Sequence, residues 1–165
     1  MLRPTRPSGL VLLALLLASC SHTAEQIVLK QFFELSRLRD RTALGAMATV
    51  IFEPAADGTV TTFIITSVDP EERQPLDDAP TPARIAALSL PNLTASKEPG
   101  RAGGQMISKT VRVSAPVRLP DGRTVRKTVS IVLARATVVR EQEIYGRWIV
   151  TGFTTYAQPS ASVNR

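Results

Sequence analysis

Cysteine and histidine are almost absent from this chain of 165 residues. It holds one of each, Cys20 and His22, and both stand near its start. Disulfides, cysteine-ligated zinc and cysteine catalysis are therefore excluded from the sequence beyond Cys20. A Ser-His-Asp triad or a histidine metal site needs a histidine inside the fold, and none follows His22. We expect neither a metal nor any other cofactor.

Aromatic residues are also scarce, at 5% of the chain, whereas 20 basic residues outnumber 14 acidic ones. The most basic part is 109–147, but no aromatic side chains alternate with its arginines to stack on bases. We therefore expect no nucleic-acid partner. A solvated sheet face is the simplest interpretation of these charges. The alternative is a stripe on one sheet face that binds anionic lipid or acidic polymers, formed by Arg112, Arg118 and Arg126.

A short apolar run opens the chain and leads directly to the single cysteine. It covers residues 10–18, follows Arg3 and Arg6, and is too short to span a bilayer. The run ends in a motif that resembles the bacterial lipobox, Leu17-Ala18-Ser19-Cys20. The resemblance implies that the chain is cut before Cys20, that its sulfur takes a diacylglyceryl group and that the new amino terminus is acylated. Such acyl chains anchor a protein lastingly to a membrane. The alternatives are an ordinary secretory signal or a buried N-terminal helix.

These features predict how the chain is divided and where it resides. About 145 residues are enough for one domain with a real core. Ser21 follows the anchor at the place where aspartate is the usual signal for inner-membrane retention. In an envelope with two membranes we therefore expect the outer one, with the protein facing the periplasm. The predicted parts are a signal peptide (1–19), a lipidated tether (20–23), one domain (24–156) and a flexible tail (157–165).

The pattern of apolar residues changes along the chain from helical to alternating. Residues 24–40 predict a long helix with a stripe of Val28, Phe32 and Leu35, and 42–48 predict a short one. Alternating segments predict strands over 49–53, 59–68 and 145–156, and a hairpin turning at Pro120-Asp121-Gly122. The expected fold is α+β, with both helices packed on a curved, mostly antiparallel, cone-like sheet.

Residues 69–108 interrupt this pattern. They contain six prolines, a cluster of acidic residues and several glycines. We expect a long, partly mobile insertion in which only the segment PARIAALSL forms a short helix.

Two blocks of the chain carry core-packing motifs, FFELSRLRDRTALGAMATVIFEP near the start and GRWIVTGF near the end. Together they resemble the cystatin-like cone superfamily of nuclear transport factor two, ketosteroid isomerase and small polyketide-cyclase-like proteins. The end resembles the family's last strand, GRWIVTGF with Trp148, which we expect to be largely buried against the long helix. The chain departs from the pattern at Ala48-Thr49, where many members carry acidic residues. The resemblance implies a fold that hosts both enzymes and non-enzymes. The first block carries it through Phe32, Phe33, Leu35, Asp40, Ala43, Leu44 and Val50.

The functional expectation is a non-catalytic envelope lipoprotein that acts as a binding or assembly module. Its partners would be the membrane, through the acyl chains on Cys20, and another envelope protein. An alternative is a small-ligand binder or an isomerase-like enzyme that uses the cone pocket. Such an enzyme needs a carboxylate base and an oxyanion donor, for which Glu53 and Tyr156 are the weak candidates. Binding of anionic lipid or polymer through the basic sheet face is the second alternative.

Overall fold

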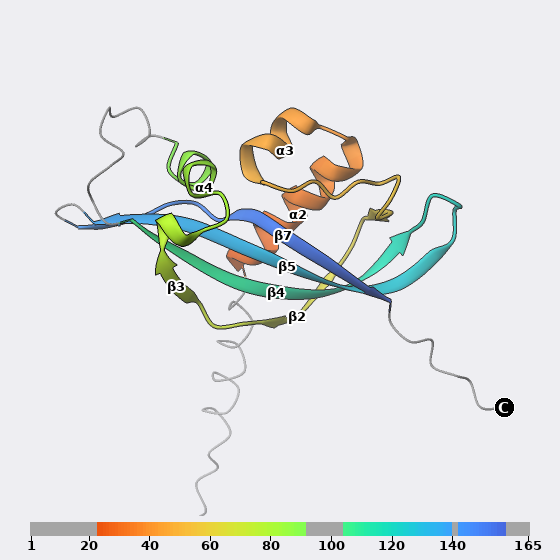
Figure 1. Ribbon diagram of the computed structural model, residues 1–165. Coiled ribbons are helices and arrows are strands. Elements are labelled where there is room, and N and C mark those ends of the chain that lie inside the picture. Colours follow the sequence, from red (N-terminus) through yellow and green to blue (C-terminus); the bar gives the residue numbers. More distant parts are fainter. Residues whose placement is uncertain (1–22, 92–103, 140–141, 158–165) are drawn as a thin grey trace, which may run out of the picture.

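The computed structural model describes residues 23–91, 104–139 and 142–157 (Figure 1). Within these ranges, three α-helices pack on one curved, open, mostly antiparallel sheet of seven strands, which confirms the expected α+β class. The helices are α2 (Thr23–Leu38), α3 (Arg41–Met47) and α4 (Pro82–Ser89). The strands are β1 (Thr59–Val60), β2 (Ile64–Val68), β3 (Glu72–Pro75), β4 (Gln105–Arg118), β5 (Thr124–Val139), β6 (Glu143–Tyr145) and β7 (Ile149–Ala157).

Strands β4 and β5 form a long hairpin at the centre of the sheet. They pair without a register shift, from Gln105 opposite Thr137 to Arg118 opposite Thr124. The short strands β1, β2 and β3 follow one another along the other side of β4, while β6 and β7 pair with β5. Both long strands bend along their length, which gives the sheet its curvature (Figure 1).

The turn of this hairpin has the chemistry that the sequence predicts. Gly122 has a φ of 86°, a conformation that glycine adopts at little cost, and donates its amide to the Leu119 carbonyl at 2.9 Å. Asp121 accepts hydrogen bonds from the amide and the guanidinium of Arg123, at 3.0 Å and 2.7 Å. These two bonds, the amide first, hold the pKa of Asp121 below its ordinary value. The turn therefore fixes the register of the hairpin.

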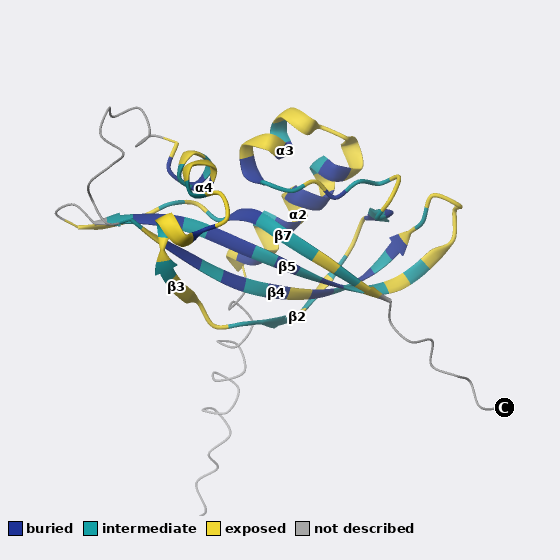
Figure 2. Ribbon diagram, in the orientation of Figure 1, coloured by how far each residue is buried: buried dark blue, intermediate teal, exposed yellow. Residues whose placement is uncertain are grey.

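Alternate residues of the long hairpin build the main core against α2. The buried residues run along both strands and along the helix sides that face the sheet (Figure 2). On α2, Leu29, Phe32 and Phe33 are buried, while Val28 and Leu35 are half-buried. The buried stripe of the helix is therefore rotated from the expected one. The inward residues of the hairpin are those that alternation predicts, Val111, Val113, Ala115, Val117, Val129, Ile131 and Leu133.

Phenylalanine rings fill the space between α2 and the sheet. The ring of Phe33 lies 5.6 Å from that of Phe32, 5.4 Å from that of Phe52 and 5.5 Å from that of Phe63, between centroids. The ring of Phe52 also lies 5.1 Å from that of Phe153. Such tilted and edge-on pairs stabilise a core beyond the area that they bury. Side chains thus occupy the interior in which a cone-shaped protein would hold a ligand.

Helix α4 covers the opposite face of the sheet at one end. Ile85 packs there with Met106, Ala134, Ala136 and Ile149. These residues of β4 and β5 alternate with the residues that face α2, so they point to the other side of the sheet. At this end, described elements therefore cover both faces of the sheet.

A close contact between Ser89 and Gly146 fixes the end of α4. The Ser89 hydroxyl accepts the Ala136 amide and donates to the Arg147 carbonyl, both at 2.9 Å. The Ser89 carbonyl accepts the Arg147 amide at 3.0 Å. A Cβ on Gly146 would lie 2.0 Å from the Ser89 hydroxyl oxygen, so this approach requires glycine.

The expected strand over 49–53 is wrong. The chain makes a single bridge from Ala48 to Val150, and the Thr49 amide donates to the Val150 carbonyl at 2.9 Å. It then enters a turn in which Asp57 accepts the Glu53 amide at 2.8 Å. The segment is apolar because Phe52, which is 1% exposed, is buried in the core, although the backbone around it is irregular.

The other two expected strands are each interrupted. Over 59–68 the register with β4 shifts by one residue between Val60 and Ile64, where Phe63 turns toward the core. Over 145–156 the chain leaves the sheet at Gly146 and returns at Ile149, because it bends around Ser89. The alternating apolar pattern predicted where these strands lie, but it did not predict where they are interrupted.

The proline-rich insertion contains secondary structure in the part that the structure describes. Strand β3 pairs with β4, and α4 forms in the predicted PARIAALSL segment. Strand β4 begins at Gln105, inside the expected insertion. The expected insertion over 69–108 therefore contains regular elements, and its residues 92–103 lie outside the described residues, so its partial mobility stays a prediction.

Candidate functional site

The predicted anchor lies outside the described residues. Leu17, Ala18, Ser19 and Cys20 precede α2, which begins at Thr23, three positions after the cysteine. No helix in the described ranges is long and apolar enough to cross a membrane. Lipidation of Cys20 therefore stays a prediction.

The two weak catalytic candidates do not form a site together. Glu53 pairs with Arg41, with Oε1 3.1 Å from the guanidinium, and lines a small recess. Tyr156 lies on β7 with 55% of its surface exposed and lines neither that recess nor the two hollows beside it. The described residues also include no cluster of three potential metal ligands. The arrangement offers no base and oxyanion donor facing one cavity.

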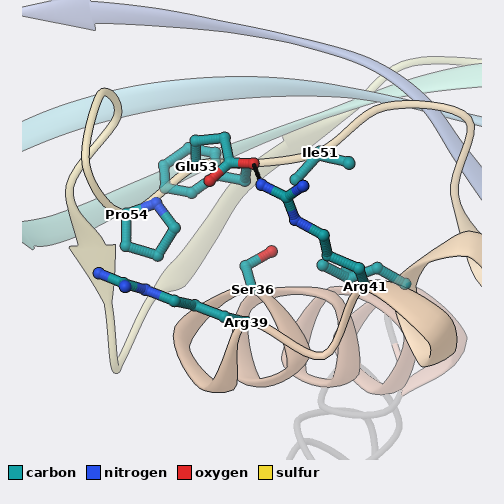
Figure 3. A pocket seen from close by; sticks show the side chains of 8 residues that line it. Ser36, Arg39, Arg41, Ile51, Glu53 and Pro54 are labelled. Atoms are coloured by element: carbon teal, nitrogen blue, oxygen red, sulfur yellow. Dashed lines mark hydrogen bonds and ion pairs between the residues drawn. The ribbon is translucent and has the colours of Figure 1, made fainter.

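The recess beside Glu53 holds an unpartnered hydroxyl. Figure 3 shows the Ser36 side chain on α2 pointing into the space between Arg41, Glu53 and Arg39. Ser36 is 2% exposed, and its hydroxyl has no hydrogen-bond partner within the part of the chain that the structure describes. The recess has a volume of about 30 Å³, enough for a water molecule or a small polar group. We call it the Ser36 recess.

Arg39 is held over this recess by the way α2 ends. Its φ is 58°, the left-handed conformation that commonly terminates helices, and its amide donates to the Ser36 carbonyl at 3.1 Å. Asp40 then caps α3 by accepting the Ala43 amide at 2.9 Å. The short connection places Arg39 and Arg41 at one end of the molecule.

A larger groove adjoins the recess through Arg39 and Pro54, which line both. Its volume is about 770 Å³, and it passes the end of α2, strand β1 and the tip of the β4–β5 hairpin. A third hollow, of about 340 Å³ between α2 and β1, shares Arg37 and Thr61 with it. We call the larger one the arginine groove, lined by Arg37, Arg39, Pro54, Ala55, Thr59, Thr61, Pro116, Arg118, Leu119, Pro120 and Thr124.

A second polar cluster lies at the other end of α2. Lys109 is 8% exposed on the face of β4 that packs against α2, and its ammonium lies 2.5 Å from a carboxylate oxygen of Glu25. Glu71 is a second acidic neighbour, at 3.7 Å. A lysine is rarely buried unless it is paired, and here the partner comes from the first turn of the helix. The pair ties the start of α2 to the sheet.

Trp148 lies within this cluster and is half-buried. The Lys109 ammonium is 4.1 Å and the Arg135 guanidinium carbon 4.3 Å from the centre of its ring. Both distances suit cation–π attraction. The expectation of a largely buried indole is therefore met only in part, because one part of the ring stays exposed beside two cations.

Charged side chains on the rim of the cluster neutralise one another. Arg135 pairs with Glu71 at 3.4 Å, and Arg73 pairs with Glu143 at 2.9 Å. The Tyr145 hydroxyl donates to Glu143 at 2.5 Å. This bond, followed by that from Arg73, lowers the pKa of Glu143 below its ordinary value. The cluster therefore offers little unbalanced charge to a ligand.

The predicted arginine stripe is exposed on the sheet face away from α2, but its members differ. Arg112 pairs with Asp69 at 2.6 Å, so its charge is neutralised. Arg126 donates to the Ser114 hydroxyl at 3.4 Å. Arg118 lines the arginine groove instead. These contacts do not favour a uniform anionic-lipid surface on this face.

Comparisons with known proteins found no match among family models, curated proteins or solved structures. The resemblance to the cystatin-like cone superfamily therefore stays a prediction. The candidate site is defined by the geometry of this chain alone.

Sequence reasoning missed the Ser36 recess and the Lys109 pair. The sequence positions of both residues indicate burial. Ser36 follows Leu29 and Phe32 on the buried stripe of the helix. Lys109 likewise shares the parity of Val111 and Val113 on β4. A polar residue at a core-facing position indicates a partner or a site, and this rule would have found both.

Proposed function

We propose that this protein is a lipid-anchored lipoprotein of a bacterial cell envelope whose folded domain is a non-catalytic binding module. The anchor part of the proposal is carried by the order of basic head, apolar run and lipobox before Cys20. A new N-terminal cysteine with several acyl chains would hold the domain at the membrane surface.

The non-catalytic part is supported by the filled interior. Phe33 and Phe52 lie in ring contact where a cone-shaped enzyme needs an open pocket. Glu53 is paired to Arg41 at the surface, and Tyr156 lies outside its recess. The hollows that the domain does offer are shallow and lie on its surface, which suits a macromolecular partner better than a small apolar ligand. We infer that this partner is another envelope protein.

The first prediction concerns Cys20→Ser in the full-length chain expressed in a bacterium that processes lipoproteins. The wild-type chain should be recovered with the membrane, shortened by residues 1–19 and carrying acyl groups on Cys20. The variant should stay an unprocessed precursor or be released, because serine offers no sulfur for lipid transfer. Mass spectrometry after membrane fractionation measures both outcomes.

Ser21→Ala is the matched control, since it changes the residue beside the anchor and should leave lipidation intact. Membrane-bound mature protein with an unmodified Cys20 thiol would contradict the anchor. Fractionation of the wild-type chain with the inner membrane of a two-membrane envelope would contradict the predicted location.

A further inference from the structure

We propose that the arginine groove and the Ser36 recess together bind an extended, acidic segment of the partner protein. The inference deepens the proposed binding function, on which it rests, by naming the surface and the chemistry of its partner. It is argued from uncompensated charge, a buried hydroxyl and the position of the groove on the molecule.

Charge is the first argument. Arg39 and Arg118 both line the groove, and neither forms an ion pair with a carboxylate within the described ranges. Arg37 also lines it and makes only a loose contact of 3.9 Å with Glu34. The cluster around Trp148 is balanced, because Lys109 and Arg73 have carboxylate partners. The groove therefore holds two arginines without a carboxylate partner in the described ranges and a third that is only loosely paired, which favours an acidic ligand.

The Ser36 hydroxyl is the second argument. Buried hydroxyls nearly always have a hydrogen-bond partner, and one without a partner calls for an acceptor or donor from outside the chain. The hydroxyl points toward the Arg41–Glu53 pair (Figure 3), in a recess that Arg39 also lines. A water molecule in the recess would accept from the hydroxyl and bridge it to a ligand carboxylate that pairs with the Arg39 guanidinium. The recess has room for this water molecule but not for a whole acidic side chain.

The shape of the surface favours an extended ligand. The recess, the groove and the hollow between α2 and β1 follow one another and share lining residues, Arg39 and then Arg37. Apolar contacts alternate with the cations along this path, from Pro54 to Leu119 in the groove and Val60 in the hollow. In an extended peptide with alternating acidic and small side chains, the acidic ones would pair with the cations and the small ones would pack on the apolar contacts.

The position of the groove favours a protein over the membrane as its ligand. Cys20 precedes Thr23 by three residues, which span at most about 11 Å. Helix α2 has 16 residues, or roughly 24 Å of length, and the groove lies at its far end. An anchor at the start of α2 therefore holds the groove away from the lipid headgroups and directs it toward other proteins.

The test measures fluorescence anisotropy of a labelled octapeptide that alternates glutamate with threonine, titrated with the full-length chain in non-ionic detergent. We expect binding that weakens with added salt, and none to the same peptide with glutamine in place of glutamate. Arg39→Ala and Arg118→Ala should each weaken binding about two- to fivefold, and the double variant about tenfold. Ser36→Ala keeps the helix and should weaken binding about threefold.

Arg126→Ala is the matched control, because it removes the same charge from the same hairpin outside the groove. It should change the affinity less than twofold. The proposal would be overturned if Arg126→Ala and Arg118→Ala lost the same affinity for the peptide. It would also be overturned if the glutamine peptide bound as tightly as the glutamate peptide, or if neither peptide bound. So would Arg118-dependent binding to phosphatidylglycerol vesicles without peptide binding. The chain in detergent needs no anchor, so a failure to bind the peptide would not contradict lipidation of Cys20. A failure of the lipidation test would likewise leave the peptide result valid.

Discussion

Among single residues, Lys109 shows how one charge can be accommodated in an otherwise apolar face. Its neighbours on the same side of β4, Ile107 and Val111, are fully buried. The charge is retained because Glu25 reaches it from α2 and Trp148 offers the face of its ring. Burying an ion pair costs desolvation that the attraction only partly offsets. The pair therefore contributes to the position of the helix on the sheet more than to net stability.

Lys109→Ala should destabilise the domain by about 3–5 kcal/mol, because it leaves the Glu25 carboxylate buried without its cation. Urea denaturation followed by circular dichroism measures the loss. Arg112→Ala is the control, since it breaks an exposed pair with Asp69 and should cost at most about 1 kcal/mol. Equal losses in the two variants would show that Glu25 finds another partner or takes up a proton easily.

At the scale of elements, α4 depends on a contact that only glycine permits. The helix has eight residues, too few to be stable alone, and tertiary contacts must hold it. Ser89 makes one hydrogen bond to Ala136 in β5 and two to Arg147 just before β7, and Gly146 makes room for them. The position of α4 and the interruption between β6 and β7 therefore depend on the same contact.

Gly146→Ala should destabilise the domain by about 1–3 kcal/mol, because the new methyl group must displace Ser89. Gly45→Ala is the matched control. A Cβ at Gly45 meets nothing within 4 Å, and alanine in α3 should stabilise it by up to about 1 kcal/mol. Thermal melting of the two variants measures opposite shifts. A Gly146→Ala variant that melts like the wild type would contradict the role given to this contact.

The elements that sequence predicts well are those whose pattern is local. The alternation from Val111 to Val117 and the Pro120-Asp121-Gly122 turn were enough to predict the hairpin and its inward face, because both depend on neighbouring residues. The segment PARIAALSL predicted α4 for the same reason.

What could not be predicted depends on contacts between distant parts of the chain. Lys109 and Glu25 are 84 positions apart, and no local pattern pairs them. The breaks at Phe63 and Gly146 arise where the core and α4 draw the chain out of the sheet. The candidate site combines the ends of a helix, a loop and a hairpin, so its residues have no common sequence signal.

At the scale of the whole molecule, the two ends of α2 carry different surfaces. The first end holds balanced charges around Trp148, and the far end holds the arginine groove, where Arg39 and Arg118 have no carboxylate partner among the described residues. If Cys20 is lipidated as proposed, the first end faces the bilayer. The domain then presents its cationic end outward.

Trp148 is the only tryptophan of the chain and tests this orientation directly. With lipidated protein in vesicles, energy transfer from Trp148 to dansyl-labelled headgroups should be strong, because the indole lies beside the Glu25–Lys109 pair at the start of α2. The control is the double variant Trp148→Phe, Thr124→Trp, which moves the indole to the arginine groove and should show weaker transfer. Equal or reversed transfer would contradict the orientation.

The interrupted edge formed by β1, β2 and β3 has a consequence for crowding. Proteins anchored in one membrane share an orientation and diffuse in two dimensions, so sheet edges of neighbouring copies meet often. Here the edge is cut into short pieces by register shifts near Phe63 and Thr66, and it carries Pro70 and charged side chains such as Glu72. Such an edge gives a neighbour no continuous row of hydrogen bonds to extend. If Cys20 is lipidated as proposed, copies can therefore pack densely along this side in the plane of the membrane without polymerising into a shared sheet.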